Sequence, residues 1–379
     1  MGQKRSIFED VQSDVKQVAT PQPGMIDRAR IGRGGVVIWL MVLFALVLAI
    51  IFVGGLTRLT DSGLSITEWK PLAGALPPLN ALDWAAEFTR YQAFPEYQLQ
   101  NSEMTLAEFK SIYWWEWGHR QLGRLVGLVW AVGFIGLLLA KRIPTGWHMR
   151  LLGIGLLGGL QGAIGWWMVS SGLGEGRVDV ASYRLAVHLG LAFIILGLIA
   201  GYIFALKRSE AEMMQARRGS EGRLVRLATA LLGLVFAQIL LGALVAGIDA
   251  GRGYTDWPLM AGRYFPEGAL DLVPLWRNFF EDAGLVQFMH RMSGYLVLAF
   301  GLIVWRASRA SGNMKTKLSF NMMLAILLLQ VILGIATVMM SAPVSIAIIH
   351  QLGAVALWVV LIRARFLALF PMAQSLRGK

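Results

Sequence analysis

Long apolar stretches alternate with shorter polar, charge-bearing segments along the whole 379-residue chain. Eight of these stretches are long enough to cross a bilayer, because a spanning helix needs roughly 20 mostly apolar residues. They lie near residues 35–56, 121–140, 150–171, 183–206, 224–247, 289–305, 318–341 and 345–366. The alternating strands of a β-barrel would not give such continuous apolar runs. The pattern predicts an all-α polytopic membrane protein with eight transmembrane helices.

The composition supports this interpretation and removes several kinds of chemistry. Only 15% of the residues are charged, against about 25% in a typical soluble protein, so the chain lacks the polar residues that a soluble surface needs. The sequence contains no cysteine. Disulfide frameworks, thiolate metal sites and cysteine nucleophiles are therefore excluded.

The net charge of +12 invites a nucleic-acid interpretation until the positions of the charges are considered. Of the 35 Lys and Arg residues, 23 fall in the N-terminal tail, the segments after the second, fourth and sixth apolar stretches, and the C-terminal end. Since positive loops stay inside, both termini are expected in the cytoplasm and the loops near 57–118 and 248–287 outside. No nucleic-acid partner is expected.

The N-terminal tail also bears on the location of the protein. Residues 1–34 mix acids with bases and have no apolar core, so they resemble neither a secretory signal nor a transit peptide. The sequence predicts a multi-pass protein of a bacterial inner (plasma) membrane.

The second half of the chain repeats the first. The segment GGLTRLTDSGLSITEW from Gly54 matches GALVAGIDAGRGYTDW from Gly242 in its helix end, its Asp and its Thr–acid–Trp triplet. Further matches pair His119-Arg120 with His290-Arg291, Gln161 with Gln330, and His188 with His350. Because four helices precede the repeat boundary, both halves should have the same topology. We therefore expect two pseudo-symmetric four-helix bundles, with the following boundaries: a tail at 1–34, bundles at 35–206 and 224–366, a cytoplasmic linker at 207–223 and a tail at 367–379.

Four of the five histidines occupy repeat-related positions near the outer ends of their spans. An intramembrane imidazole is costly unless it faces the bundle interior with a partner, so it marks a functional site. Two histidines on facing helices are what axial ligation of haem iron requires, which predicts the pairs His119 with His188 and His290 with His350. The ordinary alternative for one such histidine is an interhelical hydrogen bond. Zinc fits less well, since it takes four protein ligands, or three and a water. His148 has no counterpart and is interpreted as a solvated loop residue.

The residues beside these histidines distinguish the two halves. Glu116 stands three residues before His119, whereas Gln287 stands three before His290, and residues three apart share a helix face. A carboxylate there can act as a base or stabilise positive charge on a substrate, and a glutamine cannot act as a base. A solvated acid at a helix start is the alternative for Glu116. The N-terminal half is therefore predicted to be reactive and the C-terminal half to hold a fixed cofactor.

Arg120 and Arg291 each follow one of the paired histidines directly. Their guanidinium groups are suited to pairing with haem propionates at the membrane surface. Interfacial anchoring is the alternative role for both residues.

Several segments together resemble the haem A synthase family shared by proteobacteria and mitochondria. They are GGLTRLTDSGLSITEWKPLAGALPPL, EFKSIYWWEWGHRQLGRLVG, VHLGLAF, FMHRMSGY and IIHQLGA, and the resemblance extends over about residues 35–366. It implies haem b bound through His290 and His350, substrate haem O at His119 and His188, and a catalytic role for Glu116. The implied reaction oxidises the C8 methyl group of haem O to the formyl group of haem A. Some relatives carry a cysteine pair in the first outer loop, which this chain lacks.

Two other functions would use a similar set of histidines. A dihaem bis-histidine cytochrome b that only transfers electrons has no need of the asymmetry between Glu116 and Gln287. A haem transporter or chaperone would need no redox-competent second site. The family resemblance also implies haem O synthase and cytochrome oxidase assembly factors as partners, and it leaves homo-oligomerisation and the electron acceptor open.

Overall fold

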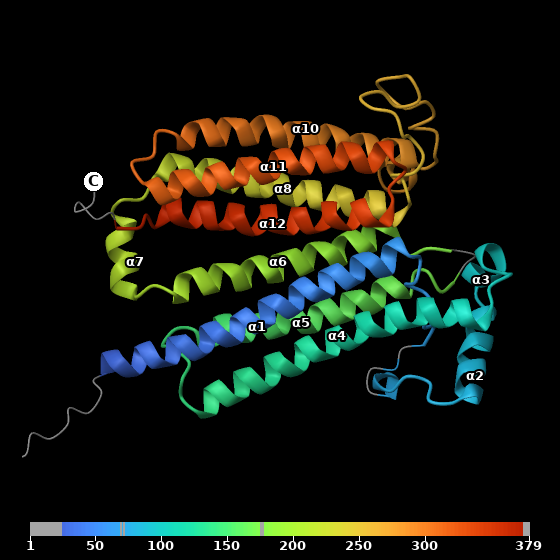
Figure 1. The fold of residues 1–379 in the computed structure, drawn as a ribbon, viewed down its shortest axis with the longest axis horizontal. Helices are drawn as coiled ribbons and strands as arrows, with labels where there is room; N and C mark the ends of the chain where they lie inside the picture. Colours follow the sequence, from blue (N-terminus) through green and yellow to red (C-terminus); the bar gives the residue numbers. More distant parts are fainter. Residues whose placement is uncertain (1–24, 69, 71–72, 175–177, 374–379) are drawn as a thin grey trace, which may run out of the picture.

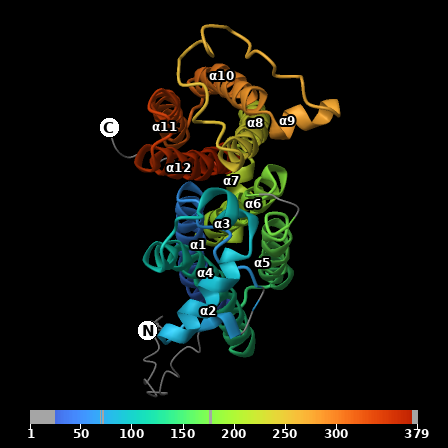
Figure 2. The same ribbon diagram turned by 90° about the vertical axis from the view of Figure 1, so that its right-hand side faces the viewer.

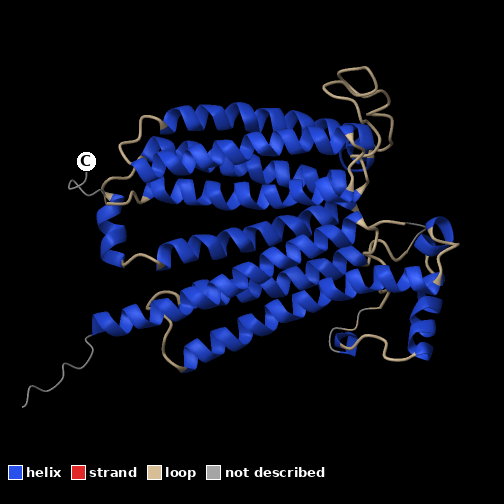
Figure 3. Cartoon of the chain, viewed as in Figure 1, coloured by secondary structure: helices blue, strands red, loops and turns tan. Residues whose placement is uncertain are grey.

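A computed structural model describes residues 25–68, 70, 73–174 and 178–373, and these residues form helices joined by loops (Figure 3). Eight helices are long and apolar enough to cross a membrane. They are α1 (Met25–Leu59), α4 (Leu106–Leu139), α5 (His148–Val169), α6 (Ser182–Leu206), α8 (Gly222–Gly247), α10 (Ala283–Ser308), α11 (Met314–Met339) and α12 (Val344–Leu369). The eight predicted spans and the all-helical class are confirmed.

The spanning helices lie in two groups. Helices α1, α4, α5 and α6 lie together, and α8, α10, α11 and α12 form the other group (Figure 2). The short helix α7 (Glu210–Arg217) connects them at one end (Figure 1). At the junction, the indole Nε1 of Trp358 donates a 2.9 Å hydrogen bond to the carbonyl of Phe193. The side chain of Gln351 donates at 2.7 Å to the carbonyl of Ile51. Apolar packing between α6 and α8 and between α1 and α12 completes the junction.

The region predicted as an outer loop at 57–118 is largely helical. Helices α2 (Ala81–Gln92) and α3 (Pro95–Gln100) lie there, and α4 begins at Leu106 rather than near 121. Thr105 and Glu108 form a reciprocal capping box at the start of α4. An aromatic cluster made of Trp84, Tyr91, Phe109 and Tyr113 packs α2 against the first turns of α4. The search for long apolar stretches missed these turns because they are stabilised by packing against the aromatic cluster and do not form a continuous apolar run.

The second segment predicted as an outer loop, near 248–287, is shorter and less helical. It contains the 3-10 turn η2 (Leu275–Arg277) and the single-turn helix α9 (Asn278–Glu281), and α10 starts at Ala283, six residues earlier than predicted. The early starts of α4 and α10 place His119 and His290 within the helices. The predicted spans near 121–140 and 289–305 put His119 and His290 at or just before a helix start, and the structure instead places both well inside their helices.

Candidate haem sites and the clasps above them

The four repeat-related histidines lie on four different helices, and all are half-buried. His119 on α4 and His188 on α6 lie within electrostatic range of each other, and so do His290 on α10 and His350 on α12. The structure thus brings together the members of each pair that the repeat predicts. His148, the fifth histidine, is exposed at the first turn of α5.

Glutamine side chains hold two of the four rings. Nε2 of Gln161 on α5 lies 3.1 Å from Nδ1 of His188 and donates to the His188 carbonyl at 2.9 Å. Nε2 of Gln238 on α8 lies 3.1 Å from Nδ1 of His290 and donates to its carbonyl at 3.0 Å. Gln161 stood out in the sequence through its match with Gln330, whereas the role of Gln238 carried no sequence signal.

The chemistry of these pairs fits haem iron. Each pair offers two imidazole rings, whose neutral nitrogens are the usual axial ligands of six-coordinate haem. Buried polar atoms that have no hydrogen-bond partner among the described residues gather beside them. They are Nδ1 of His350, Nε2 of Gln330, Oε1 of Gln161 and Oε1 of Gln238. Such atoms are rare in folded proteins and mark places where function outweighs local satisfaction.

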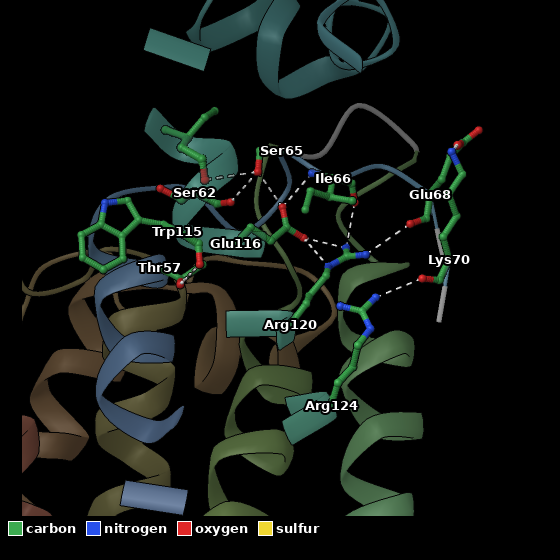
Figure 4. A network of polar contacts seen from close by, with 11 residues as sticks. Thr57, Ser62, Ser65, Ile66, Glu68, Lys70, Trp115, Glu116, Arg120 and Arg124 are labelled. Atoms are coloured by element: carbon green, nitrogen blue, oxygen red, sulfur yellow. Dashed lines mark hydrogen bonds and ion pairs between the residues drawn. The ribbon is translucent and has the colours of Figure 1, made fainter. Parts of the chain in front are cut away.

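Glu116 is almost completely buried, with 3% exposure, and both of its carboxylate oxygens accept hydrogen bonds (Figure 4). Oε2 accepts from the Ser65 hydroxyl at 2.7 Å and from the Ile66 amide at 2.7 Å. Oε1 accepts from Nε and Nη2 of Arg120 at 3.1 and 2.6 Å. Arg120 also donates to the carbonyls of Ile66 at 2.8 Å and Glu68 at 3.2 Å. We call this set, which ties α4 to the loop after α1, the Glu116 clasp.

The second half contains a matching set, which we call the Gln287 clasp. Gln287 is 1% exposed, and its Oε1 accepts from Nη2 of Arg291 at 3.1 Å. Arg291 donates to the carbonyls of Tyr254 and Asp256 at 2.8 and 3.0 Å, the residues that the repeat aligns with Ile66 and Glu68. One contact is reversed. Glu116 accepts from the Ile66 amide, whereas Nε2 of Gln287 donates to the Tyr254 carbonyl at 3.1 Å.

The clasps give both arginines a contact that the sequence did not indicate. Arg120 and Arg291, predicted to pair with haem propionates, use their guanidinium groups here on loop carbonyls. The repeated Thr–acid–Trp triplets mark the loop segments that these arginines hold. The repeated triplets were therefore a sequence signal for the clasps, but the sequence did not show that Arg120 and Arg291 would bind them.

Arg58, at the end of α1, joins the two helix groups at the ends that carry the segments predicted as outer loops. Its side chain is 13% exposed and lies 2.6 Å from Asp61, 3.5 Å from Asp179 and 2.9 Å from Asp249. Asp61 and Asp249 are equivalent in the repeat, so a single arginine bridges both copies of this position. Burial raises the pKa of Asp179 above its usual value even though Arg58 opposes that shift.

Glu96 on α3 is a second buried carboxyl group, in the segment between α1 and α4. It is 4% exposed, and Oε2 lacks a hydrogen-bond partner within the described chain. Burial, followed by the negative charges of Glu116, Asp179 and Asp61, raises the pKa of Glu96 to about 8. The carboxyl group therefore holds a proton at neutral pH. Its burial was not apparent from the sequence, because it lies in a segment that was expected to be a loop.

Paired intramembrane histidines in two adjacent helix groups are typical of multi-pass haem proteins. The chain belongs to the COX15-CtaA family, whose model, described as "Cytochrome oxidase assembly protein", matches residues 37–362. A "Heme A synthase" of Dinoroseobacter shibae is 63% identical over 380 residues, covering 100% of this chain and 99% of that protein. That of Ruegeria pomeroyi is 62% identical and covers 100% of both chains. That of Paracoccus denitrificans is 55% identical and covers 99% of both chains. The resemblance seen in the sequence is thereby confirmed.

Proposed function

We propose that the N-terminal half carries out the oxidation and that the C-terminal half holds the haem cofactor. By close full-length homology the chain is a haem A synthase, a membrane oxidoreductase that converts haem O to haem A. The observation that carries the division of labour is the difference between the two clasps. In both, an arginine binds the central side chain and two equivalent loop carbonyls, but only the N-terminal clasp places a carboxylate one helical turn from a paired histidine.

His119 and His188 position the iron of substrate haem O, and His290 and His350 hold haem b. Bound haem b supplies one-electron transfer, carrying electrons from the substrate toward an acceptor. His290 and His350 would hold haem b through two imidazole nitrogens, a ligand set that suits electron transfer. The orphaned polar atoms beside both pairs support haem binding at each. Haem O enters laterally from the lipid, where its farnesyl tail is soluble.

Glu116 acts through a fixed negative charge. Four hydrogen bonds hold its two oxygens in place before any substrate arrives. A preorganised charge of this kind stabilises the positive charge that develops on a substrate carbon as it is oxidised. Acting as a base would require Glu116 to give up one of these bonds, so the clasp favours the electrostatic role. The same bonds fix the loop that covers the outer end of the bundle.

The remaining features of this proposal come from the sequence and the family. The two helix groups are pseudo-symmetric bundles bounded as the repeat predicts, in a bacterial inner membrane with both termini cytoplasmic. Arg120 and Arg291 pair with propionates while keeping contact with their loops. Haem O synthase and cytochrome oxidase assembly factors are the expected neighbours in the pathway.

Extraction and chromatography of the haems in purified protein test the proposal. The synthase should contain haem b together with haem O, a hydroxylated haem or haem A. Two haem b molecules per chain, with no other haem, would instead identify an electron-transferring cytochrome b. Haem O recovered unchanged, with no oxidised haem under turnover conditions, would identify a haem carrier.

A further inference from the structure

Each of the four paired histidines packs against a glycine on a neighbouring helix. A methyl group placed on Gly165 would lie 2.9 Å from Cε1 of His188, and one on Gly242 would lie 3.1 Å from Cε1 of His290. On Gly334 it would lie 3.3 Å from Cε1 of His350. On Gly54 the nearest ring atom is Nε2 of His119, at 2.9 Å. All four distances are shorter than ordinary van der Waals contact, so any larger residue would displace the ring.

Three of these glycines stand four residues after a glutamine on the same helix. The pairs are Gln161 with Gly165, Gln238 with Gly242, and Gln330 with Gly334. Residues four apart lie on one helix face, so each helix offers a hydrogen-bonding amide and a flat surface side by side. We call this arrangement a glutamine–glycine seat.

Two of the three seats hold their histidine by hydrogen bonds. Gln161 and Gln238 each contact both Nδ1 and the backbone carbonyl of the seated histidine. At the third seat, Nε2 of Gln330 and Nδ1 of His350 are both buried, and neither has a hydrogen-bond partner among the residues described. The third seat thus has the same chemistry with its polar groups still unsatisfied.

The fourth histidine lacks this support. The residue four before Gly54 is Ile50, which takes the place of Gln238. The equivalence holds in space as well. A methyl group on Gly294 would lie 3.3 Å from Nε2 of Gln238, and one on the repeat-related Gly123 would lie 3.6 Å from Cδ1 of Ile50. His119 therefore rests on a glycine with no amide beside it.

Some glycines of these helices make no close approach to a neighbouring helix. At Gly158 on α5 and Gly233 on α8, an added methyl group would find no atom of the described chain within 4 Å, outside its own helix and adjacent residues. Other glycines of the same helices approach other residues as closely, such as Gly155 with Trp130 and Gly247 with Ser182, so the four positions are distinguished by the histidine ring that they face. Gly158 and Gly233 serve as controls on the same helices.

We propose that the glutamine–glycine seats fix His188, His290 and His350 as lasting haem ligands, and that His119, whose seat lacks a glutamine, is the exchangeable one. An enzyme whose substrate and product are both haems needs one ligand that releases easily, whereas a resident haem needs none. The seats place this ligand in the N-terminal half. This inference rests on the proposed assignment of substrate to that half.

The proposal can be tested by the rate of haem transfer to excess apomyoglobin from full-length protein loaded with haem O in detergent. The wild type should release haem in two phases, with haem O in the fast phase. Gln238→Leu should speed the slow phase about tenfold, as expected for loss of the hydrogen bond to the His290 ring, and Ile50→Gln should slow the fast phase. Gly242→Ala should lower haem b content, while Gly233→Ala should leave content and rates unchanged.

Gln161→Leu, which should speed the fast phase, keeps the proposal testable if Ile50→Gln fails to fold. Release in a single phase would overturn the proposal. So would a slow phase unchanged by Gln238→Leu, or a fast phase that Ile50→Gln leaves unchanged or accelerates. Chromatography of each released fraction identifies its haem independently. A chain that holds two haem b molecules and forms no product from haem O would refute the proposed function. The effects of Gln238→Leu on the slow phase and of Ile50→Gln on the fast phase would still test the glutamine–glycine seats.

Discussion

The Glu116 clasp and the Gln287 clasp share an arginine that holds two equivalent loop carbonyls, and they differ most at the central residue. In both, an arginine one turn farther along the helix holds the carbonyls of a loop. In the N-terminal half the central residue is a carboxylate that only accepts hydrogen bonds, and in the C-terminal half it is an amide that also donates. Both halves therefore use the clasp to hold a loop against a helix. What remains particular to Glu116 is its charge, which is the property a reaction would use.

Removing that charge should have the largest effect. Glu116→Gln should lower haem A formation by about 10²–10³-fold, the usual cost of losing one preorganised electrostatic group. The loop should stay in place, since Gln287 already holds its own loop as an amide. Ser65→Ala is the matched control, because it removes one hydrogen bond to the carboxylate and keeps the charge. Normal product yield from Glu116→Gln, with haem b retained, would contradict the assigned role.

Breaking the bridge between the halves should have the next largest effect. Arg58→Met leaves three carboxylates around an unpaired site and should lower stability by about 1–3 kcal/mol, less than a fully buried pair would cost because the carboxylates are partly exposed. Thermal unfolding followed by haem absorbance measures the loss. Arg277→Met removes a more exposed pair with Glu281 and should cost less than about 1 kcal/mol. Equal losses in the two variants would show that Arg58 has no special structural role.

The reverse exchange in the C-terminal half should have a smaller effect. Gln287→Glu removes the donor to the Tyr254 carbonyl and brings two acceptors together, while Arg291 compensates part of the cost. We expect a loss of about 1 kcal/mol, seen as a lower unfolding temperature and a modest fall in haem b content. No second oxidised haem should appear. An unfolding temperature equal to that of the wild type would mean that the bond from Gln287 to the Tyr254 carbonyl does not distinguish the two clasps.

A further difference between the two halves is Glu96, which has no counterpart in the C-terminal half. Its pKa of about 8 in the folded protein exceeds the value of about 4.3 in an unfolded chain. Between these values the folded state holds an extra proton, so this carboxyl makes stability fall as pH rises through the window and then level off. Glu96→Gln cannot ionise, and its unfolding temperature relative to wild type should rise from pH 5 to pH 8. A difference in unfolding temperature between Glu96→Gln and wild type that stays constant over this range would contradict a buried, protonated carboxyl group.

The sequence predicted most of what lies within the membrane. Hydropathy identified all eight spans, and the internal repeat paired histidines that lie within electrostatic range of each other in the structure. Both signals arise from strong constraints. Lipid requires long apolar helices, and duplication repeats any residue that the structure depends on.

The parts that escaped prediction lie outside those constraints. The early start of α4 is held by aromatic packing and a capping box, and the T-x-x-E spacing of Thr105 and Glu108 was the available signal. The contacts of Arg58 and Gln238 depend on which helices become neighbours, and neither residue has a repeat partner of its own type. Glu96 is buried by the packing of the outer segment, which composition alone does not reveal.

The central claim is that one half reacts and the other holds the cofactor. Haem extraction and chromatography on His119→Ala and His290→Ala, prepared side by side, test it most directly. The account predicts that His119→Ala retains haem b and forms no haem A, whereas His290→Ala loses haem b. Equal loss of haem b from both variants, or normal haem A formation by His119→Ala, would contradict it.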